Sequence, residues 1–272
     1  MAPEHDGERF SERVAALRRR LRELERVAVA FSGGVDSTVL LHAAHAELGE
    51  GAIGVIADSP SLPRRELELA RAAAEAIGAR LEVVATDELG DERYRANAGD
   101  RCYFCKSALF EAMAPWVRER GFRALLFGEI ADDLLDERPG RRAAHEFGVL
   151  APLAEAGFTK DDVRRYAREH SLSVAEKPSS ACLASRIPVG TRVTRERLAT
   201  IEAAEARLAT LALGVRRVRH LGESARVEVE PALLEAARDA RPSIERELLP
   251  LGFTRVELDA YRTPLERLQR WK

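Results

Sequence analysis

The residues Ser32-Gly33-Gly34-Val35-Asp36-Ser37 combine two adjacent glycines with two hydroxyl side chains and a carboxylate. They follow the apolar run 27–31 and precede residues 38–48, whose apolar positions have helical spacing. Paired glycines let backbone N–H groups approach an anion closely, and the first turn of a helix adds further unpaired N–H groups. The pattern predicts a phosphate-binding turn, with an ordinary glycine turn as the alternative. A Walker loop and a dinucleotide loop are excluded, because the Gly-Lys-Ser/Thr and G-x-G-x-x-G spacings are absent.

Three cysteines form a second group of chemically capable residues. Cys102 and Cys105 lie in a C-x-x-C, and Cys182 lies in a polar, proline-bearing stretch. An odd number of cysteines argues against a disulfide framework. The spacing is compatible with an iron–sulfur cluster, with a zinc site completed by a histidine, and with thiols that act without metal. Ligand counting favours the cluster, because three thiolates would leave one iron of a cubane open for an added sulfide or a substrate atom.

Composition restricts the class of protein. The chain has 272 residues, of which 46% are hydrophobic and 32% charged, as in a globular protein with one large or two smaller domains. No apolar run approaches the roughly 18 residues of a membrane span, and residues 1–8 lack a signal-peptide pattern, so a cytoplasmic location without membrane contact is expected. The net charge of −2 argues against a nucleic-acid partner.

Predicted strands and helices alternate along the first half of the chain, and they must position the loop 32–37 and the cysteines. Strands are expected at 27–31, 52–58, 80–85 and 123–127, with a helix over 64–77, and residues 148–153 are expected to close the sheet. Such alternation indicates a parallel α/β sheet. Ligands of these sheets bind at the carboxyl ends of strands, which places four segments in one crevice: 32–37, 58–59, 86–87 and 128–133.

The second half is predicted to contain a smaller α+β module. Thr159 is expected to cap a helix that runs to about His170. Further elements are expected at 195–213 and 232–240 as helices and at 215–220, 226–230 and 254–258 as strands. The predicted organisation is a flexible N-terminal segment with a first helix, a nucleotide domain, a functional loop and linker, and a small α+β domain, over 1–20, 21–176, 177–193 and 194–272 respectively.

Residues 32–37 resemble the pyrophosphate loop, or PP-loop, of the N-type ATP pyrophosphatases, which split ATP into AMP and pyrophosphate. Cys-Tyr-Phe-Cys together with Cys182-Leu-Ala-Ser-Arg-Ile187 makes the chain similar to the LarE family, the ATP-dependent sulfur transferases of nickel-pincer cofactor biosynthesis. The resemblance runs from about Leu21 to Leu258 and rests also on residues 131–133, 138–140, 151–153, 177–178, 201–205 and 218–220. It implies a parallel doubly wound sheet of the PP-loop ATP pyrophosphatase type, followed by a small α+β domain.

The resemblance implies a reaction in two stages. A carboxylate of pyridinium-3,5-biscarboxylic acid mononucleotide is adenylated, and sulfur then displaces AMP to give a thiocarboxylate. Some members sacrifice a cysteine, and others hold a [4Fe-4S] cluster on three cysteines that relays sulfide from a donor. Cys102, Cys105 and Cys182 match the second type. The implied cofactors are ATP, Mg²⁺ and the cluster, and the implied assembly is a homo-oligomer, a hexamer.

Roles for individual residues follow from the same resemblance. The residues expected to bind ATP and Mg²⁺ are Ser32, Gly33, Gly34, Asp36, Ser37, Asp58, Asp132 and Asp133. The residues expected to bind the mononucleotide are Ser185, Arg186, Arg217, Arg219, Glu205 and Glu228. Arginine forks suit phosphate oxygens, and alternate positions of a strand share one face. The alternatives are a helix cap for Asp36, the start of the next turn for Asp132 and Asp133, and solvated surface for the arginines and glutamates. Glu129-Ile130 departs from the family, which carries a small or hydroxyl residue and an asparagine there.

Three other functions remain open at this point. A tRNA thiolase joins the same ATP loop to a C-x-x-C and a third cysteine, and it would need a broad basic face with strongly salt-dependent binding. An ammonia-using ligase would leave the cysteines structural. A non-catalytic nucleotide- or zinc-binding regulator would bind without releasing pyrophosphate.

Overall fold

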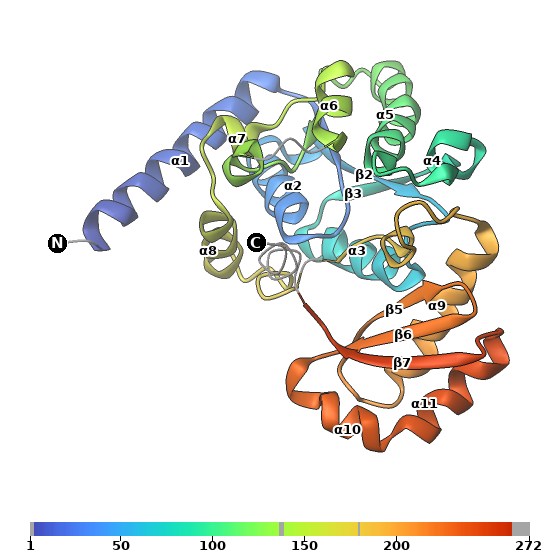
Figure 1. The fold of residues 1–272 in the computed structure, drawn as a ribbon. Helices are drawn as coiled ribbons and strands as arrows, with labels where there is room; N and C mark the ends of the chain where they lie inside the picture. The colour runs from blue at the N-terminus through green and yellow to red at the C-terminus, as the bar shows by residue number, and fades with distance from the viewer. Residues whose placement is uncertain (1–2, 136–138, 179, 263–272) are drawn as a thin grey trace. The chain divides into compact units, whose positions relative to one another are not determined.

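The computed structural model describes residues 3–135, 139–178 and 180–262 (Figure 1). The chain divides into two compact units, one of Met1–Tyr94 with Asp100–Ser180 and the other of Arg95–Gly99 with Ala181–Lys272. The short segment 95–99 therefore joins the second unit, which the sequence did not predict. Within the described ranges, none of the helices combines the length and apolar character needed to cross a bilayer.

The first unit is built on a four-stranded parallel sheet of order β3-β2-β1-β4. Its strands are β1 Val27–Ala30, β2 Ala52–Asp58, β3 Arg80–Ala85 and β4 Ala124–Phe127. The α/β prediction is confirmed, and the predicted strands agree with the observed ones within one residue. Residues 148–153 do not form a full strand: Leu150 makes an isolated parallel bridge to Leu126, and a helix begins at Pro152, whose missing N–H cannot extend a ladder.

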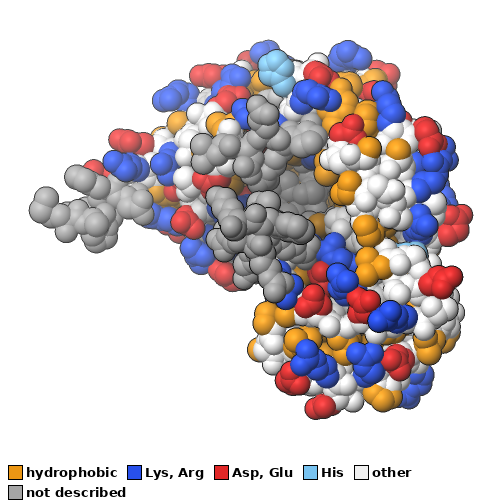
Figure 2. All heavy atoms as spheres, viewed as in Figure 1, with side chains coloured by type: hydrophobic (Ala, Val, Ile, Leu, Met, Phe, Trp, Pro, Cys, Tyr) orange, Lys and Arg blue, Asp and Glu red, His pale blue; other side chains and the backbone are white. Residues whose placement is uncertain are grey.

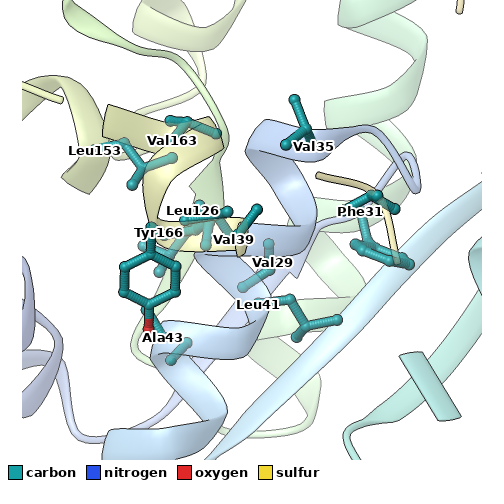
Figure 3. Packing of buried hydrophobic residues seen from close by; sticks show 14 of the residues in the cluster. Val29, Phe31, Val35, Val39, Leu41, Ala43, Leu126, Leu153, Val163 and Tyr166 are labelled. Atoms are coloured by element: carbon teal, nitrogen blue, oxygen red, sulfur yellow. The ribbon is translucent and has the colours of Figure 1, made fainter. Parts of the chain in front are cut away.

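Helices cover both faces of this sheet, as Figure 1 shows. Along β1, Val27 and Val29 belong to one apolar cluster and Ala28 and Ala30 to another, because successive side chains of a strand point to opposite faces. Figure 3 shows the first cluster, in which Val29 packs among side chains from the neighbouring helices. The helices of the first unit are α1 Pro3–Leu24, α2 Val35–Leu48, α3 Arg64–Ile77, α5 Arg101–Glu119, α6 Pro139–Glu146, α7 Pro152–Glu155 and α8 Lys160–Glu169. The short helix α4 Glu92–Ala96 runs into the segment 95–99, which belongs to the second unit.

The second unit is a three-stranded sheet of order β5-β6-β7 with helices. Strand β5 pairs with β6 antiparallel, and β6 pairs with β7 parallel. Its elements are α9 Arg195–Ala209, β5 Val215–Leu221, β6 Ser224–Val229, α10 Leu234–Asp239, α11 Arg241–Leu248 and β7 Arg255–Ala260. Helix α9 ends before the predicted Leu213, because Ala212 and Gly214 adopt positive φ angles of 53° and 59°.

Helix α11 was not predicted from the sequence. It begins beside Pro242, and proline is tolerated in the first turn of a helix, where N–H groups lack partners in any case. Short 3₁₀ turns complete the two units: η1 Gly49–Gly51, η2 Glu88–Gly90, η3 Ala131–Leu135, η4 Leu183–Arg186, η5 Pro231–Leu233 and η6 Leu249–Leu251.

Candidate nucleotide and thiol sites

The loop 32–37 connects β1 to α2, as its sequence predicts. Gly34 is the N-cap of α2 and makes no side-chain capping bond, so Asp36 in the first turn is not the cap. The two serines organise the loop from within. The Ser37 hydroxyl donates to Gly34 O at 3.2 Å, accepts from Ser32 N at 3.2 Å and lies 3.1 Å from Ser32 Oγ. A helix start without a side-chain cap is a suitable place for an anion.

Two glycines are required by close packing around this loop. Gly33 has a φ of +67°, and a Cβ placed on it would lie 2.7 Å from Ala70 Cβ on α3. Gly128, which follows β4, would place a Cβ 2.9 Å from Ser37 N. The first turn of α2 therefore packs closely against the residue that follows β4, and the loop residue Gly33 packs closely against α3. Only glycine allows both approaches without displacement of a neighbour.

Asp36 is paired with a lysine that sequence reasoning missed. Lys160 Nζ donates to both carboxylate oxygens of Asp36, at 2.6 and 2.7 Å. Lys160 is the first residue of α8, and Thr159 with Asp162 forms a capping box there, which confirms the predicted cap. The backbone N–H of Lys160 also donates to Asp132 Oδ2 at 2.8 Å. One lysine thus connects two of the predicted ATP-binding carboxylates.

A second lysine contacts the loop backbone. Lys177 Nζ donates to Gly33 O at 2.9 Å and pairs with Glu66 at 2.7 Å. The lysine and glutamate side chains are only 17% and 18% exposed. Lys177 belongs to the residues that carry the family resemblance, but its sequence position gave no indication of this contact.

The other predicted ATP-binding residues lie at the same edge of the sheet. Asp58 ends β2 and accepts a hydrogen bond from Arg64, which also donates to Ser59 O and Leu62 O. Asp133 lies in η3 beyond β4 and accepts from Ile130 N at 3.3 Å. The carboxyl ends of parallel strands share one edge, so all four predicted segments lie along it.

No group of three His, Cys, Asp or Glu side chains able to hold a metal ion occurs among the residues with described positions. Mg²⁺ does not require such a group, because the ion retains waters and takes one or two carboxylates together with substrate phosphates. Asp36 places one carboxylate at the loop 32–37, where it is paired with Lys160. Arg138, part of the family resemblance, lies outside the described residues.

None of Cys102, Cys105 and Cys182 is part of a disulfide. Cys102 and Cys105 are the second and fifth residues of α5, and a separation of three residues places them on one helix face. Cys102 is exposed and Cys105 half-buried. Cys182 is half-buried and belongs to the second unit, where it precedes η4. The donor set therefore has the right chemistry for an iron–sulfur cluster, but the described structure does not show it as one ligand group.

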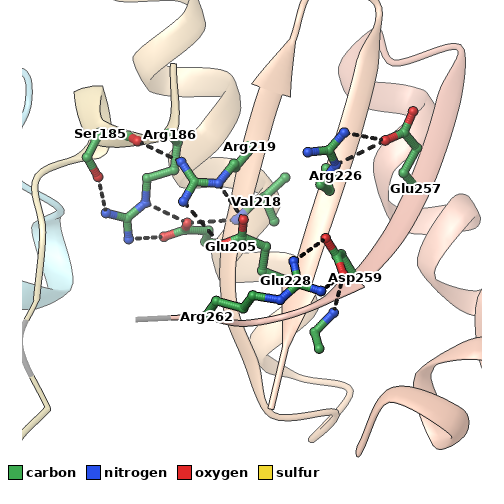
Figure 4. A network of polar contacts seen from close by, with 11 residues as sticks. Ser185, Arg186, Glu205, Val218, Arg219, Arg226, Glu228, Glu257, Asp259 and Arg262 are labelled. Atoms are coloured by element: carbon green, nitrogen blue, oxygen red, sulfur yellow. Dashed lines mark hydrogen bonds and ion pairs between the residues drawn. The ribbon is translucent and has the colours of Figure 1, made fainter. Parts of the chain in front are cut away.

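The loop that carries Cys182 is attached to the second unit through Arg186 (Figure 4). Arg186 is 5% exposed, and its Nε and Nη2 donate to the two carboxylate oxygens of Glu205 at 2.9 and 3.1 Å. Its Nη1 donates to the carbonyl oxygens of Ala181 and Cys182. Glu205 also accepts from Val218 N on β5 at 2.9 Å. This guanidinium joins the thiol-bearing loop to α9 and β5.

A second arginine completes the network. Arg219 donates to both carboxylate oxygens of Glu228 and, through Nη1, to Ser185 O at 3.1 Å. Arg217, two residues earlier on β5, lies over the Tyr261 ring at 5.0 Å. The structure thus brings five of the six predicted mononucleotide residues into one network: Ser185, Arg186, Glu205, Arg219 and Glu228. In it, the two arginines mainly contact carboxylates and backbone carbonyls of the protein itself.

Sequence comparisons match the chain to one family model and to several known proteins. The family model described as asparagine synthase matches residues 13–243. A protein of Synechocystis sp. without an assigned function is 41% identical over 219 residues, covering 80% of this chain and 82% of the relative. The pyridinium-3,5-bisthiocarboxylic acid mononucleotide synthase of Lactiplantibacillus plantarum is 36% identical over 240 residues, covering 88% of this chain and 87% of that enzyme. The argininosuccinate synthase of Haloquadratum walsbyi is 35% identical over 164 residues, covering 56% of this chain and 41% of that enzyme.

Proposed function

Because the chain belongs to the asparagine synthase family, and within it to the LarE-like PP-loop ATP pyrophosphatases, we propose that it is the ATP-dependent sulfur transferase that acts on pyridinium-3,5-biscarboxylic acid mononucleotide. The observation that carries the proposal is the glycine loop 32–37, which leads into a helix without a side-chain cap at the end of a parallel strand. The relative from Lactiplantibacillus plantarum supports the choice of substrate.

The proposed reaction has two steps, adenylation of the substrate and transfer of sulfur to it. A substrate carboxylate oxygen attacks the α-phosphorus of ATP, and the bond to the β-phosphate oxygen breaks, so that an acyl adenylate and pyrophosphate form. A sulfur nucleophile then attacks the carbonyl carbon of the adenylate, and AMP leaves with the electron pair of the broken C–O bond. The products are a thiocarboxylate, AMP and pyrophosphate.

The residues of the first unit suit the first step. The loop N–H groups and the Ser32 and Ser37 hydroxyls would hold the leaving pyrophosphate. Asp36 would coordinate Mg²⁺, and Lys160, released from Asp36, would donate to phosphate oxygens. The Lys160–Asp36 ion pair would therefore be exchanged for two ligand contacts when MgATP binds.

We further propose that sulfur is supplied through Cys102, Cys105 and Cys182 as ligands of a [4Fe-4S] cluster. Their number, and the absence of a disulfide at any of the three, support this choice. Bound in this way, a cluster would leave one iron open to accept sulfide from a donor. The rival source is Cys182 itself, which would lose its sulfur and become dehydroalanine.

Anaerobic reconstitution with iron and sulfide tests the sulfur source. Wild type is expected to take up four irons per chain, the number in a [4Fe-4S] cluster, and to form thiocarboxylate repeatedly. Cys102→Ala and Cys182→Ala should both lose the cluster and turnover. If Cys102→Ala retained one turnover and its mass then fell by one H₂S, Cys182 would be the sacrificial donor. Full activity in Cys182→Ala would exclude both schemes.

A tRNA thiolase is the second candidate, because it would use the same loop and cysteines. On the face shown in Figure 2, Lys and Arg side chains are interspersed with Asp and Glu rather than gathered in one basic patch, which favours a small substrate. Pyrophosphate release stimulated by the mononucleotide, and unchanged by tRNA at low salt, is expected. Pyrophosphate release that is stimulated by tRNA and not by the mononucleotide would favour the tRNA thiolase instead.

The proposal includes a homo-oligomeric state, which analytical ultracentrifugation would measure.

A further inference from the structure

The backbone of the phosphate loop is held from two sides at Gly33. On one side the glycine is in close contact with Ala70 of α3, with room for no side chain. On the other side Lys177 Nζ donates to the Gly33 carbonyl oxygen at 2.9 Å. Lys177 lies 144 residues away in sequence, so the contact is a product of the tertiary fold.

The hydrogen bond from Lys177 to the Gly33 carbonyl oxygen also affects the next residue, Gly34, because the two residues share a peptide bond. A trans peptide is planar, and its C=O and N–H groups point in opposite directions. A lysine that fixes the Gly33 carbonyl therefore also fixes the direction of the Gly34 N–H. That N–H makes a long contact of 3.4 Å with Ser32 Oγ, on the side where the serine hydroxyls meet. The Gly34 N–H therefore points to the side of the loop where the Ser32 and Ser37 hydroxyls lie.

The charge on Lys177 is already balanced. Its ammonium group pairs with Glu66 at 2.7 Å, and both side chains are more than four-fifths buried. Glu66 lies in the first turn of α3, so the lysine is anchored to the same helix that packs against Gly33. A lysine held in this way acts mainly through the orientation of the peptide and not through a free positive charge.

We propose that Lys177 is a positioning residue that, anchored by Glu66, holds the Gly33–Gly34 peptide with its N–H turned toward the ATP phosphates. The proposal deepens the function inferred above and rests on ATP binding by the loop. It makes the phosphate affinity of the loop depend on a residue that begins the polar stretch leading to Cys182.

The variant Glu66→Gln distinguishes a positioning role of Lys177 from direct phosphate binding by its ammonium group. The two roles predict opposite changes in the affinity for pyrophosphate. If Lys177 positions the peptide, loss of its anchor weakens binding of pyrophosphate. If the ammonium itself binds phosphate, removal of the competing carboxylate strengthens binding. Lys177→Gln should weaken pyrophosphate binding about tenfold, as expected for loss of one charge-assisted hydrogen bond, and Lys177→Arg should recover part of it.

Calorimetric titrations with inorganic pyrophosphate, MgATP and AMP provide the measurement. We expect Glu66→Gln and Lys177→Gln to bind pyrophosphate and MgATP more weakly and AMP with unchanged affinity, since AMP lacks the leaving phosphates. The control Glu169→Gln breaks the exposed Arg165–Glu169 pair and should leave the affinities for pyrophosphate, MgATP and AMP unchanged. The amide resonance of Gly34 should shift in both ligand-free test variants and not in the control.

Tighter pyrophosphate binding by Glu66→Gln, or unchanged binding with an unmoved Gly34 resonance, would overturn the proposal. Absence of pyrophosphate and ATP binding in wild type would instead refute the proposed function. Thermal unfolding of each variant identifies a general loss of structure, which would lower the affinity for AMP as well.

Discussion

Glu205→Gln should destabilise the protein, because Glu205 is the countercharge of the buried Arg186 guanidinium. Glu205→Gln keeps the size and shape of the side chain but removes its charge. In the wild type, Glu205 accepts two hydrogen bonds from Arg186 and one from Val218 N. A glutamine has one acceptor oxygen and an NH₂ group in place of the other. One of these donors is therefore left facing another donor, and the buried guanidinium loses its countercharge.

The burial of the two side chains sets the size of the effect. The Arg186 side chain is 6% exposed and Glu205 22%. Loss of one partner from a fully buried ion pair costs about 3–5 kcal/mol, and the partial exposure of Glu205 reduces this to about 2–3 kcal/mol. The matched control is Glu257→Gln. It breaks the Arg226–Glu257 pair, whose side chains are 39% and 33% exposed, and should cost less than about 1 kcal/mol.

Urea unfolding followed by circular dichroism measures the stabilities, and hydrogen exchange of the Val218 amide measures the local effect. Glu205→Gln should also increase the alkylation rate of Cys182, because Arg186 would no longer hold the carbonyls of Ala181 and Cys182 as firmly. Equal loss of stability in Glu205→Gln and Glu257→Gln would refute the argument from burial. An unchanged Cys182 alkylation rate would refute the link to the thiol loop.

Three further predictions concern the first unit. Lys160→Met should weaken MgATP binding about 10- to 100-fold in calorimetry while stability changes by less than about 1 kcal/mol, because its ion pair is partly exposed; unchanged affinity would remove Lys160 from phosphate binding. Gly33→Ala should lower the free energy of unfolding in urea by about 2–4 kcal/mol through its positive φ and the 2.7 Å Cβ contact with Ala70. Ala70→Gly should restore only part of this, and full restoration would show that φ strain is negligible. Burial lowers the pKa of His42 to about 4, below the ordinary 6.5, so the unfolded chain binds more protons between these values. Stability should therefore fall as pH decreases from about 6.5 to about 4, and His42→Asn should show a smaller slope; an equal slope would contradict the shifted pKa.

The local features of this protein were determined by the sequence. The turn 32–37 between strand and helix, the Thr159 cap and the alternating strands of the parallel sheet all follow from short-range patterns, since glycine geometry, capping and apolar periodicity act over a few residues. The same patterns identified the carboxyl edge where the predicted ATP-binding residues lie. They failed at 148–153, where an apolar run contributes one bridge and not a strand.

The partners of the candidate site were decided only by the tertiary structure. Lys160 and Lys177 meet the loop from 124 and 144 residues away, and Arg186 is held by a glutamate on another helix. No local pattern distinguishes these residues from other lysines and arginines in a chain with 43 of them. Their contacts depend on how the helices pack against the sheets. The sequence specifies which residues are charged, but the packing of the helices against the sheets determines which of these charges pair.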